Sequence, residues 1–320
     1  MKQSILITLM KPSILVGGQA VIEGVMMRVP GAYATAVRDP KGQIKLQRHE
    51  FTSVTEKSRF WKRPIFRGMA SLYEAMKMGM KTLQWSADVA MPEEAEKEPS
   101  KIADWLSMVF AIVLALVLFM IAPYWITTHV LGVGKQALLF NVAAGAMRIS
   151  FFLLYLFIIS MLKDVKRLFQ YHGAEHKVVY NFESGKDINI KNAQNFPTPH
   201  PRCGTSFMFI VLVSAILVFA ILDTLVIAAV GNISLAVRLG MHLPFIPLVA
   251  GVGYEVIKLT SKNESILFRI LRKPGLWLQN ITTKQPDDDM VEVAITSLQS
   301  AFGERYEETT GQEYTAEAIG

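Results

Sequence analysis

The sequence predicts a mainly α-helical membrane protein with four transmembrane helices, a small cytoplasmic α+β region before them and a cytoplasmic helical region after them. Hydrophobic residues make up 51% of the 320 positions and charged residues only 19%, and the mean hydropathy is +0.31. Soluble domains of average composition carry about 25% charged residues. In addition, four stretches are each apolar over the roughly 20 residues that a helix needs to cross a bilayer.

Residues 1–101 are predicted to form the α+β region. The apolar run 5–10 ends at Lys11, too early for the core of a cleavable signal peptide, so we expect none. Within the β-rich stretch 13–60, residues 39–42 read Asp-Pro-Lys-Gly. Proline presets φ and glycine tolerates positive φ, so this tetrapeptide predicts the turn of a β-hairpin.

Residues 66–87 have the spacing of an amphipathic helix, with Lys77 and Lys81 beside an apolar stripe. Such a helix either lies on the membrane surface or packs, half-buried, against other segments. An acidic stretch, residues 92–100, follows as a solvated linker. The stripe comprises Phe66, Met69, Leu72, Tyr73, Met76, Met80 and Leu83.

Residues 102–257 are predicted to form the membrane domain. Pro244 and Pro247, together with two glycines, predict that the fourth span is kinked or partly unwound. Tyr124 and Trp125 fit an aromatic belt at the membrane surface. The four predicted spans are residues 102–126, 137–161, 205–230 and 235–257.

Basic residues predict the orientation. There are 16 Lys and Arg up to residue 101, seven in the loop 162–204 and seven from residue 258 on, whereas the short loops on the other side hold only Lys135. The positive-inside rule therefore places both termini and the loop 162–204 in the cytoplasm of a multi-pass plasma-membrane protein in contact with lipid. These flanks account for the net charge of +6, so we expect no nucleic-acid partner.

Two ionisable residues fall inside the apolar spans. Arg148 lies near the middle of the second span, and Asp223 lies in the third, at a depth that differs by only about 6 Å. We therefore expect an ion pair inside the membrane that sets the register of the two helices. Transport is the less favoured role, because four spans are few and no repeated half is visible.

Residues 258–320 are predicted to form the helical C-terminal region. Three aspartates, 287–289, precede a helix with an apolar face, and acidic residues are typical of a helix start. The glutamate-rich end, from Glu304 to Glu317, is predicted to be disordered.

The motif His172-x-x-Glu175-His176 in the cytoplasmic loop is the main chemical signal. On a helix, two histidines four residues apart face the same way and can chelate one divalent metal, zinc first. Glu175 beside them could act as general base or as a ligand. The motif matches the inverted zincin pattern, although Gly173 inside it weakens the helix slightly.

Three further residues are candidates for completing this site: His200 or Cys203, which precede the third span, and Glu255, near the cytoplasmic end of the fourth. The solitary cysteine excludes a disulfide scaffold and multi-cysteine zinc ribbons. In the alternative interpretation, the histidines are interfacial and hydrogen-bonded, Cys203 fills space and Glu255 pairs with Lys258 or Arg202. Shared coordination also requires either that the chain after the second span bends back toward the bilayer, which we expect, or that the loop alone holds the metal.

Several segments in this order resemble the YqhQ-like bacterial membrane family, a domain-of-unknown-function group labelled as predicted metal-dependent enzymes. The resemblance implies His172, Glu175, His176, His200, Cys203 and Glu255 as site residues. It also implies that Gly17-Gly18 and Glu23 pack against the loop, although the glycines could simply form a tight turn. The segments are residues 17–28, 67–68, 171–177, 200–205, 254–255 and 285–294.

Two functions follow from these residues. The first is a membrane-bound, metal-dependent, hydrolase-like enzyme in which Glu175 activates water and the substrate arrives from the cytoplasm or the inner leaflet. The second is a non-catalytic membrane partner, in which the same cluster is structural and the protein docks on another membrane machine such as the translocon or a membrane protease. The two are distinguished by the coordination sphere, since catalytic zinc keeps an open position.

Overall fold

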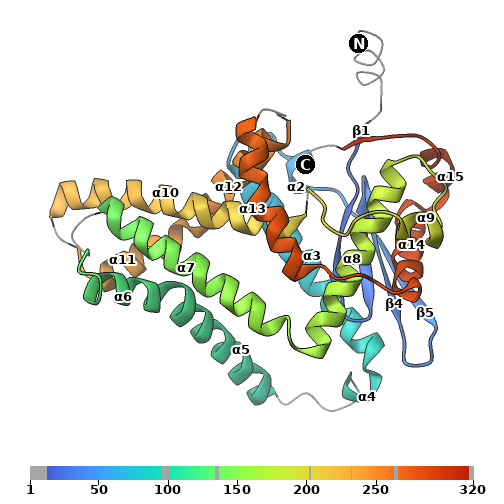
Figure 1. The fold of residues 1–320 in the computed structure, drawn as a ribbon, viewed down its shortest axis with the longest axis horizontal. Coiled ribbons are helices and arrows are strands. Elements are labelled where there is room, and N and C mark those ends of the chain that lie inside the picture. The colour runs from blue at the N-terminus through green and yellow to red at the C-terminus, as the bar shows by residue number, and fades with distance from the viewer. Residues whose placement is uncertain are drawn as a thin grey trace, which may run out of the picture.

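A computed structural model describes residues 13–95, 101–133, 137–201, 203–231, 233–262 and 266–316. Long apolar helices lie on one side and a small sheet with its covering helices lies on the other (Figure 1). The apolar run 5–10, Lys135 and Arg202 belong to the predictions above but lie outside the described residues.

The first region is an antiparallel sheet with the strand order β2-β3-β4-β5. The predicted hairpin is confirmed as β4 and β5: the Asp39 carboxylate accepts hydrogen bonds from the Lys41 and Gln43 amides at 2.9 and 2.8 Å, and Gly42 has a φ of +82°. The tight β2–β3 turn holds Glu23 at a φ of +50°. The strands are β2 (Gly17–Val21), β3 (Gly24–Val29), β4 (Ala32–Arg38) and β5 (Ile44–Glu50).

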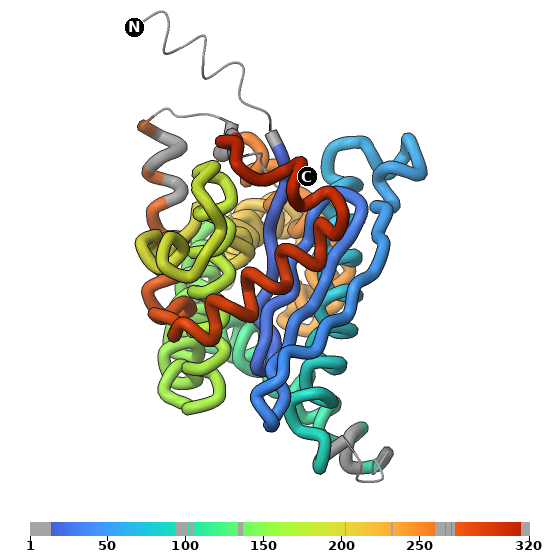
Figure 2. Tube along the Cα trace, turned by 90° about the vertical axis from the view of Figure 1, so that its right-hand side faces the viewer, coloured from blue at the N-terminus to red at the C-terminus, as the bar shows by residue number. Residues whose placement is uncertain are grey.

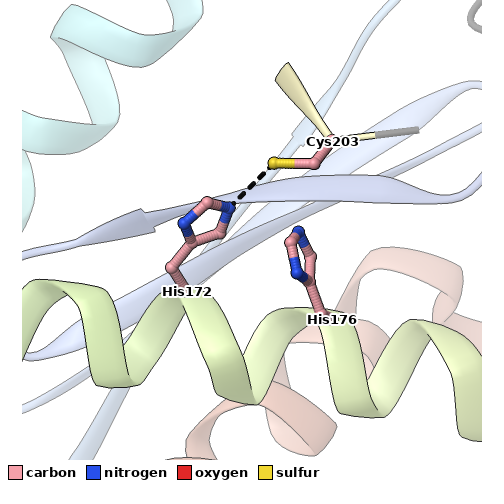
Figure 3. Close-up of side chains that lie close together, drawn as sticks. All are labelled: His172, His176 and Cys203. Atoms are coloured by element: carbon pink, nitrogen blue, oxygen red, sulfur yellow. Dashed lines mark hydrogen bonds between the residues drawn. The ribbon is translucent and has the colours of Figure 1, made fainter. Parts of the chain in front are cut away.

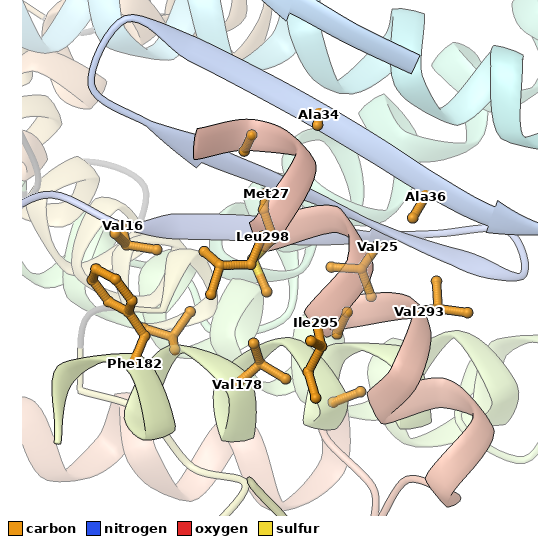
Figure 4. Packing of buried hydrophobic residues seen from close by; sticks show 14 of the residues in the cluster. Val16, Val25, Met27, Ala34, Ala36, Val178, Phe182, Val293, Ile295 and Leu298 are labelled. Carbon is orange, nitrogen blue, oxygen red and sulfur yellow. The ribbon is translucent and has the colours of Figure 1, made fainter. Parts of the chain in front are cut away.

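The two faces of this sheet are covered by different helices. One face packs on α8 (Lys163–Glu183) and α14 (Asp288–Phe302), and it forms the largest core together with them (Figure 4). The other face packs on α3 (Phe66–Ala90), through Met26, Tyr33 and Met78. Figure 2 shows the sheet between α14 and α3. Segments from the start, middle and end of the chain therefore share one folded unit.

Among the described residues, four helices are long and apolar enough to cross a membrane, as the sequence predicts. The fourth is interrupted by a 3₁₀ turn at Leu243–Phe245, which confirms the predicted break around Pro244. The first contains a π-helical turn at Val117–Ile121, just before Pro123. The segments are α5 (Lys101–Leu116) with α6 (Ala122–His129), α7 (Ala137–Ile159), α10 (Gly204–Val230), and α11 (Leu235–His242) with α12 (Ile246–Lys262).

The predicted amphipathic helix is α3, and of the two interpretations the structure does not bury the apolar stripe against other segments. Its small and polar side chains, among them Gly68, Glu74 and Ser86, pack inside, whereas most of the apolar stripe is exposed, with Met80 at 71%. Gly68 permits this packing, because a Cβ there would lie 2.6 Å from the Tyr254 Cβ on α12.

The prediction of a disordered C-terminal end is wrong for residues 304–316. This segment forms the short helix α15 (Tyr306–Thr309) and the strand β6 (Thr315–Ala316), which pairs in parallel with β1 (Ser13–Ile14). Tyr314 stacks on Phe182 at 5.0 Å, and its amide donates to the Glu183 carbonyl. Aromatic side chains among the glutamates therefore anchor the segment; Glu317 lies outside the described residues.

The predicted Arg148–Asp223 ion pair is also wrong. Asp223 accepts a hydrogen bond from His242 at 2.8 Å and lies 3.6 Å from the Arg238 Nε, and both partners come from α11. Arg148 instead donates to the Phe119 carbonyl at 2.9 Å and lies over the Tyr124 ring. The prediction paired Arg148 and Asp223 because they lie at similar depths in the second and third spans. Arg238 and His242 are four residues apart on one face of α11, in the fourth span, and both reach the Asp223 carboxylate.

We call the group formed by Tyr124, Asn141, Asp223, Arg238 and His242 the apolar-helix cluster. The Tyr124 hydroxyl bonds to the second ring nitrogen of His242, and the Asn141 amide donates to Asp223 at 2.7 Å. All five side chains are buried. The cluster ties α6, α7, α10 and α11 together with polar bonds inside the apolar helices.

Candidate metal centre

The motif containing His172 and His176 lies on α8, whose position depends on a bend in the chain. Helix α7 ends at Ile159, and α8 starts at Lys163 in a new direction after a short turn (Figure 1). This is the bend that the sequence analysis required. It brings the middle of α8 beside the first turn of α10, where Cys203 is the N-cap residue.

Three side chains converge there: His172, His176 and Cys203 (Figure 3). One donor atom from each lies within 4.8 Å of the other two. The His172 Nε2 is 3.1 Å from the Cys203 Sγ, and the two imidazole rings are 4.4 Å apart. Of the three candidates that the sequence left for completing the site, the structure brings Cys203 into the group.

The other nitrogen of each imidazole is fixed by a backbone carbonyl. The His172 Nδ1 lies 2.8 Å from the carbonyl oxygen of Thr282, at the end of α13 (Ile266–Thr282), and the His176 Nδ1 bonds to the Thr198 carbonyl. Because a carbonyl can only accept, each Nδ1 carries the proton and each neutral ring keeps its lone pair on Nε2. Metal-binding histidines are oriented in this way.

A buried lysine supports the loop that supplies one of these carbonyls. Lys177 donates to the carbonyls of Gln194 and Phe196 at 2.8 and 2.6 Å, and burial lowers its pKa. These bonds hold the chain just before Thr198. Lys177 therefore acts on His176 through the loop rather than by direct contact.

Glu175 is buried between α8 and the edge strand β2. The Gly18 amide donates a hydrogen bond to its carboxylate, which lies 4.0 Å from the His172 Nε2. Burial raises the pKa of Glu175, and the imidazoles of His172 and His200 oppose this shift. A Cβ on Gly18 would lie 2.3 Å from the Met26 carbonyl oxygen and 3.1 Å from the Glu175 Cγ, so glycine permits this approach.

The predicted packing of Glu23 against the loop is confirmed. Its carboxylate pairs with Arg167 and accepts a hydrogen bond from the Tyr171 hydroxyl at 3.3 Å, both from α8. Gly173, inside the motif, also has a packing role, because a Cβ there would lie 2.0 Å from the Lys284 carbonyl oxygen. The glycine that weakened the helix prediction is what allows residues 282–284 to reach His172.

His200 lies beside the three donors but outside their group. Its ring is 5.5 Å from that of His176, and its Nε2 is 3.7 Å from a Glu183 carboxylate oxygen. Burial lowers the pKa of His200 to about 4, and it also lowers that of His176. His200 thus lines the site, and its imidazole faces the carboxylate of Glu183.

Glu255 does not join the cluster, contrary to the prediction. Its carboxylate accepts hydrogen bonds from the Arg67 Nε at 2.7 Å and from the Ile65 amide at 3.1 Å. This pair fastens the start of α3 to α12. Lys258 and Arg202 are the partners that the sequence suggested for Glu255, whereas Arg67 lies 188 positions away, beyond the reach of local patterns.

A cavity of about 550 Å³ opens beside the three donors. Sequence reasoning missed one of its residues, Arg28 on β3. Side chains alternate between the two faces of a strand, and this alternation could have placed Arg28. Met27 and Val29 face the core, so Arg28 faces the α3 side of the sheet. The cavity is lined largely by apolar side chains, including Leu15, Val16, Met26, Met78, Leu168, Phe169 and Met208, together with Glu175, His200 and the three donors.

The fold and the site define a class of protein: a mainly helical chain with four helices of membrane-spanning length and a His₂Cys donor cluster beside a small sheet. The family follows from sequence comparison. The profile of the family described as "Protein of unknown function (DUF1385)" matches residues 63–304, and the chain belongs to this family.

A Bacillus subtilis (strain 168) protein described as "Uncharacterized protein YqhQ" is 34% identical over 299 residues, which cover 88% of this chain and 90% of the relative. The resemblance inferred from the sequence motifs is thereby confirmed. No solved structure gives a significant match. Neither description assigns an activity, so any function has to be argued from the geometry of the site.

Proposed function

We propose that this protein is a membrane-bound, metal-dependent hydrolase with its site at the cytoplasmic surface of the bacterial plasma membrane. The observation that carries the proposal is the convergence of the His172 Nε2, the His176 imidazole and the Cys203 Sγ within 4.8 Å. Scattered donors would have removed its basis.

The residues fit a zinc ion by their chemistry. Imidazole nitrogen and thiolate sulfur are preferred zinc donors, and three protein ligands leave one position of a tetrahedron open, as in catalytic sites. The carbonyls of Thr282 and Thr198 hold both rings in the tautomer that such a site needs. A zinc ion bound here would supply Lewis acidity.

Glu175 is the proposed general base. Its carboxylate is buried at the wall of the cavity, held by the Gly18 amide and 4.0 Å from the His172 Nε2. From this position it could take a proton from a water molecule in the cavity and return it to a leaving group. The apolar walls of the cavity would keep bulk water away from the reacting groups.

The distribution of basic residues supports the cytoplasmic location. Many of the Lys and Arg residues lie on the sheet, α3, α8 and α13, all at one end of the apolar helices (Figure 1). Cys203 would then lie in a reducing compartment, where a free thiolate remains available as a ligand.

Metal analysis of the purified full-length protein tests the proposal. We expect about one zinc per chain, lost in the His172→Ala, His176→Ala and Cys203→Ala variants and retained in His129→Ala, which removes an exposed histidine of α6. Glu175→Gln should keep the zinc, because this residue is proposed as a base and not as a ligand.

Two results would contradict the proposal and favour the alternative, a non-catalytic partner of a translocon or a membrane protease. The first is a metal content that the His172, His176 and Cys203 variants leave unchanged. The second is an X-ray absorption spectrum that shows four protein ligands, because a closed coordination sphere is typical of structural zinc.

A further inference from the structure

The cavity beside the metal centre combines apolar walls with one cationic group. Its lining comes from β2 and β3, from α3 through Ala75 and Met78, from α8 through Leu168 and Phe169, and from the start of α10 through Met208. Apolar lining with few polar groups is typical of sites for small organic ligands, and about 550 Å³ is an ordinary volume for one.

Arg28 is the cationic group. Its guanidinium lies over the Phe51 ring, 4.5 Å from the centroid, and within the described residues it makes no hydrogen bond or ion pair. The carboxylates of Glu74 and Glu56 attract the guanidinium through space, but neither is bonded to it, and Glu74 accepts hydrogen bonds from the Ser53 hydroxyl and the Val54 amide instead. A guanidinium has five donors, and leaving them unpaired in a partly buried place is costly. The unpaired donors of Arg28 therefore favour the binding of an anion.

The position of the cavity indicates where a ligand would come from. Helix α10 is one of the membrane-length helices and begins at Gly204, so Met208 lies only about 6 Å along it. On the outer side of α3, Tyr73, Met76 and Met80 are exposed. The cavity thus lies where the apolar helices meet the sheet, next to apolar surface on both α3 and α10.

We propose that this cavity binds an anionic amphiphile from the adjacent lipid leaflet, with its acyl chain against the apolar wall and its carboxylate or phosphate on Arg28. We also propose that this amphiphile is the substrate of the metal centre, and that part of the inference rests on the proposed function. An acyl chain carrying one anionic head matches both kinds of lining.

The dimensions favour an amphiphile over a membrane-spanning polypeptide. A helix roughly 10 Å across fills roughly 400 Å³ in a single turn, so the cavity could admit little more than one turn of a peptide substrate. An acyl chain is thinner and could enter between α3 and the start of α10, which contribute Ala75 and Met208 to the lining.

Photo-crosslinking tests the proposal with the full-length protein in nanodiscs of neutral phosphatidylcholine. The probes carry the same diazirine-labelled C16 chain as a free fatty acid, as phosphatidic acid or as the neutral alcohol. We expect the fatty acid, the phosphatidic acid or both to label cavity residues such as Leu168 and Met208, with the alcohol labelling them at least about tenfold less. The two anionic probes distinguish a free fatty acid from a phospholipid as the source.

Three variants sharpen this experiment. Arg28→Gln should lower labelling by the anionic probes at least about tenfold and leave the alcohol unchanged. Arg63→Gln, which removes an exposed guanidinium that also lies over a phenylalanine, should have no effect. Ala75→Phe narrows the cavity without changing charge, and it should lower cavity labelling even if Arg28→Gln fails to fold.

Equal labelling by the acids and the alcohol, or cavity labelling insensitive to both Arg28→Gln and Ala75→Phe, would overturn the inference. So would labelling confined to the outer surfaces of the apolar helices. The zinc content of the wild-type protein separates the two proposals. Arg28-dependent labelling of a wild-type protein that binds no zinc supports the amphiphile site and contradicts the enzyme, whereas a zinc-containing wild type without such labelling does the reverse.

Discussion

Among the residues that the structure describes, the apolar-helix cluster and the candidate metal centre both contain histidines, and they use their imidazoles differently. In the apolar-helix cluster, His242 bonds through one ring nitrogen to Asp223 and through the other to Tyr124, so both are taken by protein partners. In the candidate metal centre, His172 and His176 each give only Nδ1 to a backbone carbonyl. Their remaining nitrogens turn toward a thiol and a cavity.

This difference separates a structural cluster from a chemically competent one. A histidine whose two nitrogens are both bonded to neighbouring side chains holds helices together, and it has no lone pair left for a ligand. A histidine oriented by one carbonyl is positioned while its second nitrogen stays available. His172 is also bonded at both nitrogens, but its Nε2 partner is the Cys203 thiol, which is itself a metal donor. The identity of the second partner, more than burial, therefore distinguishes the two sites.

The largest effect is expected in the structural cluster. Asp223→Ala removes the carboxylate that His242, Asn141 and Arg238 share, and loss of one member of a buried ionic group costs about 3–5 kcal/mol. Unfolding in detergent micelles, followed by temperature and by denaturant, should show this loss. The zinc content of the folded fraction should stay at the wild-type level, and a parallel loss of zinc would show that the two clusters are coupled.

Gly173→Ala should come next, because it affects the candidate centre through packing alone. The new Cβ would lie 2.0 Å from the Lys284 carbonyl oxygen, and overpacking of this kind costs about 1–3 kcal/mol. Displacing residues 282–284 should also loosen the His172 Nδ1 bond and weaken zinc binding, as measured by competition with a chelator.

Gly240→Ala is the matched control. It adds a methyl group to helix α11 where no atom lies within 4 Å, so its stability should equal or exceed that of the wild type. Similar losses in both variants would mean that contact with Lys284 is not the cause.

These contrasts also explain what the sequence could predict. Three features are local patterns, and the described residues confirm each of them: helices long and apolar enough to cross a membrane at the four predicted spans, the hairpin at residues 39–42, and the helical spacing of His172 and His176. Hydropathy, turn chemistry and helical periodicity depend only on neighbouring residues, which is why they could be read directly.

Long-range pairing is what could not be predicted. Arg67 and Glu255 are 188 positions apart, and the Asp223–His242 bond depends on how α10 and α11 pack against each other. The role of Arg28 depends on which side of the sheet α3 covers. In each case the sequence contains a conspicuous charged side chain, but the tertiary structure determines which group it contacts.

Lys177→Met should reduce metal affinity with a smaller effect on stability. The substitution removes the ammonium that holds the Gln194 and Phe196 carbonyls, which loosens the loop carrying the Thr198 carbonyl. Supporting groups around metal ligands typically contribute 10–100-fold to affinity, and we expect about tenfold here because Lys177 acts through the loop. Unchanged affinity in a chelator titration would show that Thr198 is held by other contacts.

The smallest effect is expected for Glu255→Gln. The Arg67–Glu255 pair is partly exposed, with side-chain exposures of 27% and 20%, so its loss should cost no more than about 1 kcal/mol. Zinc content should not change, because Glu255 bonds to Arg67 and Ile65 and lies outside the three-donor group. Loss of zinc in this variant would mean that the contact between α12 and α3 affects the metal centre. The metal centre would then not be independent of the structure around it.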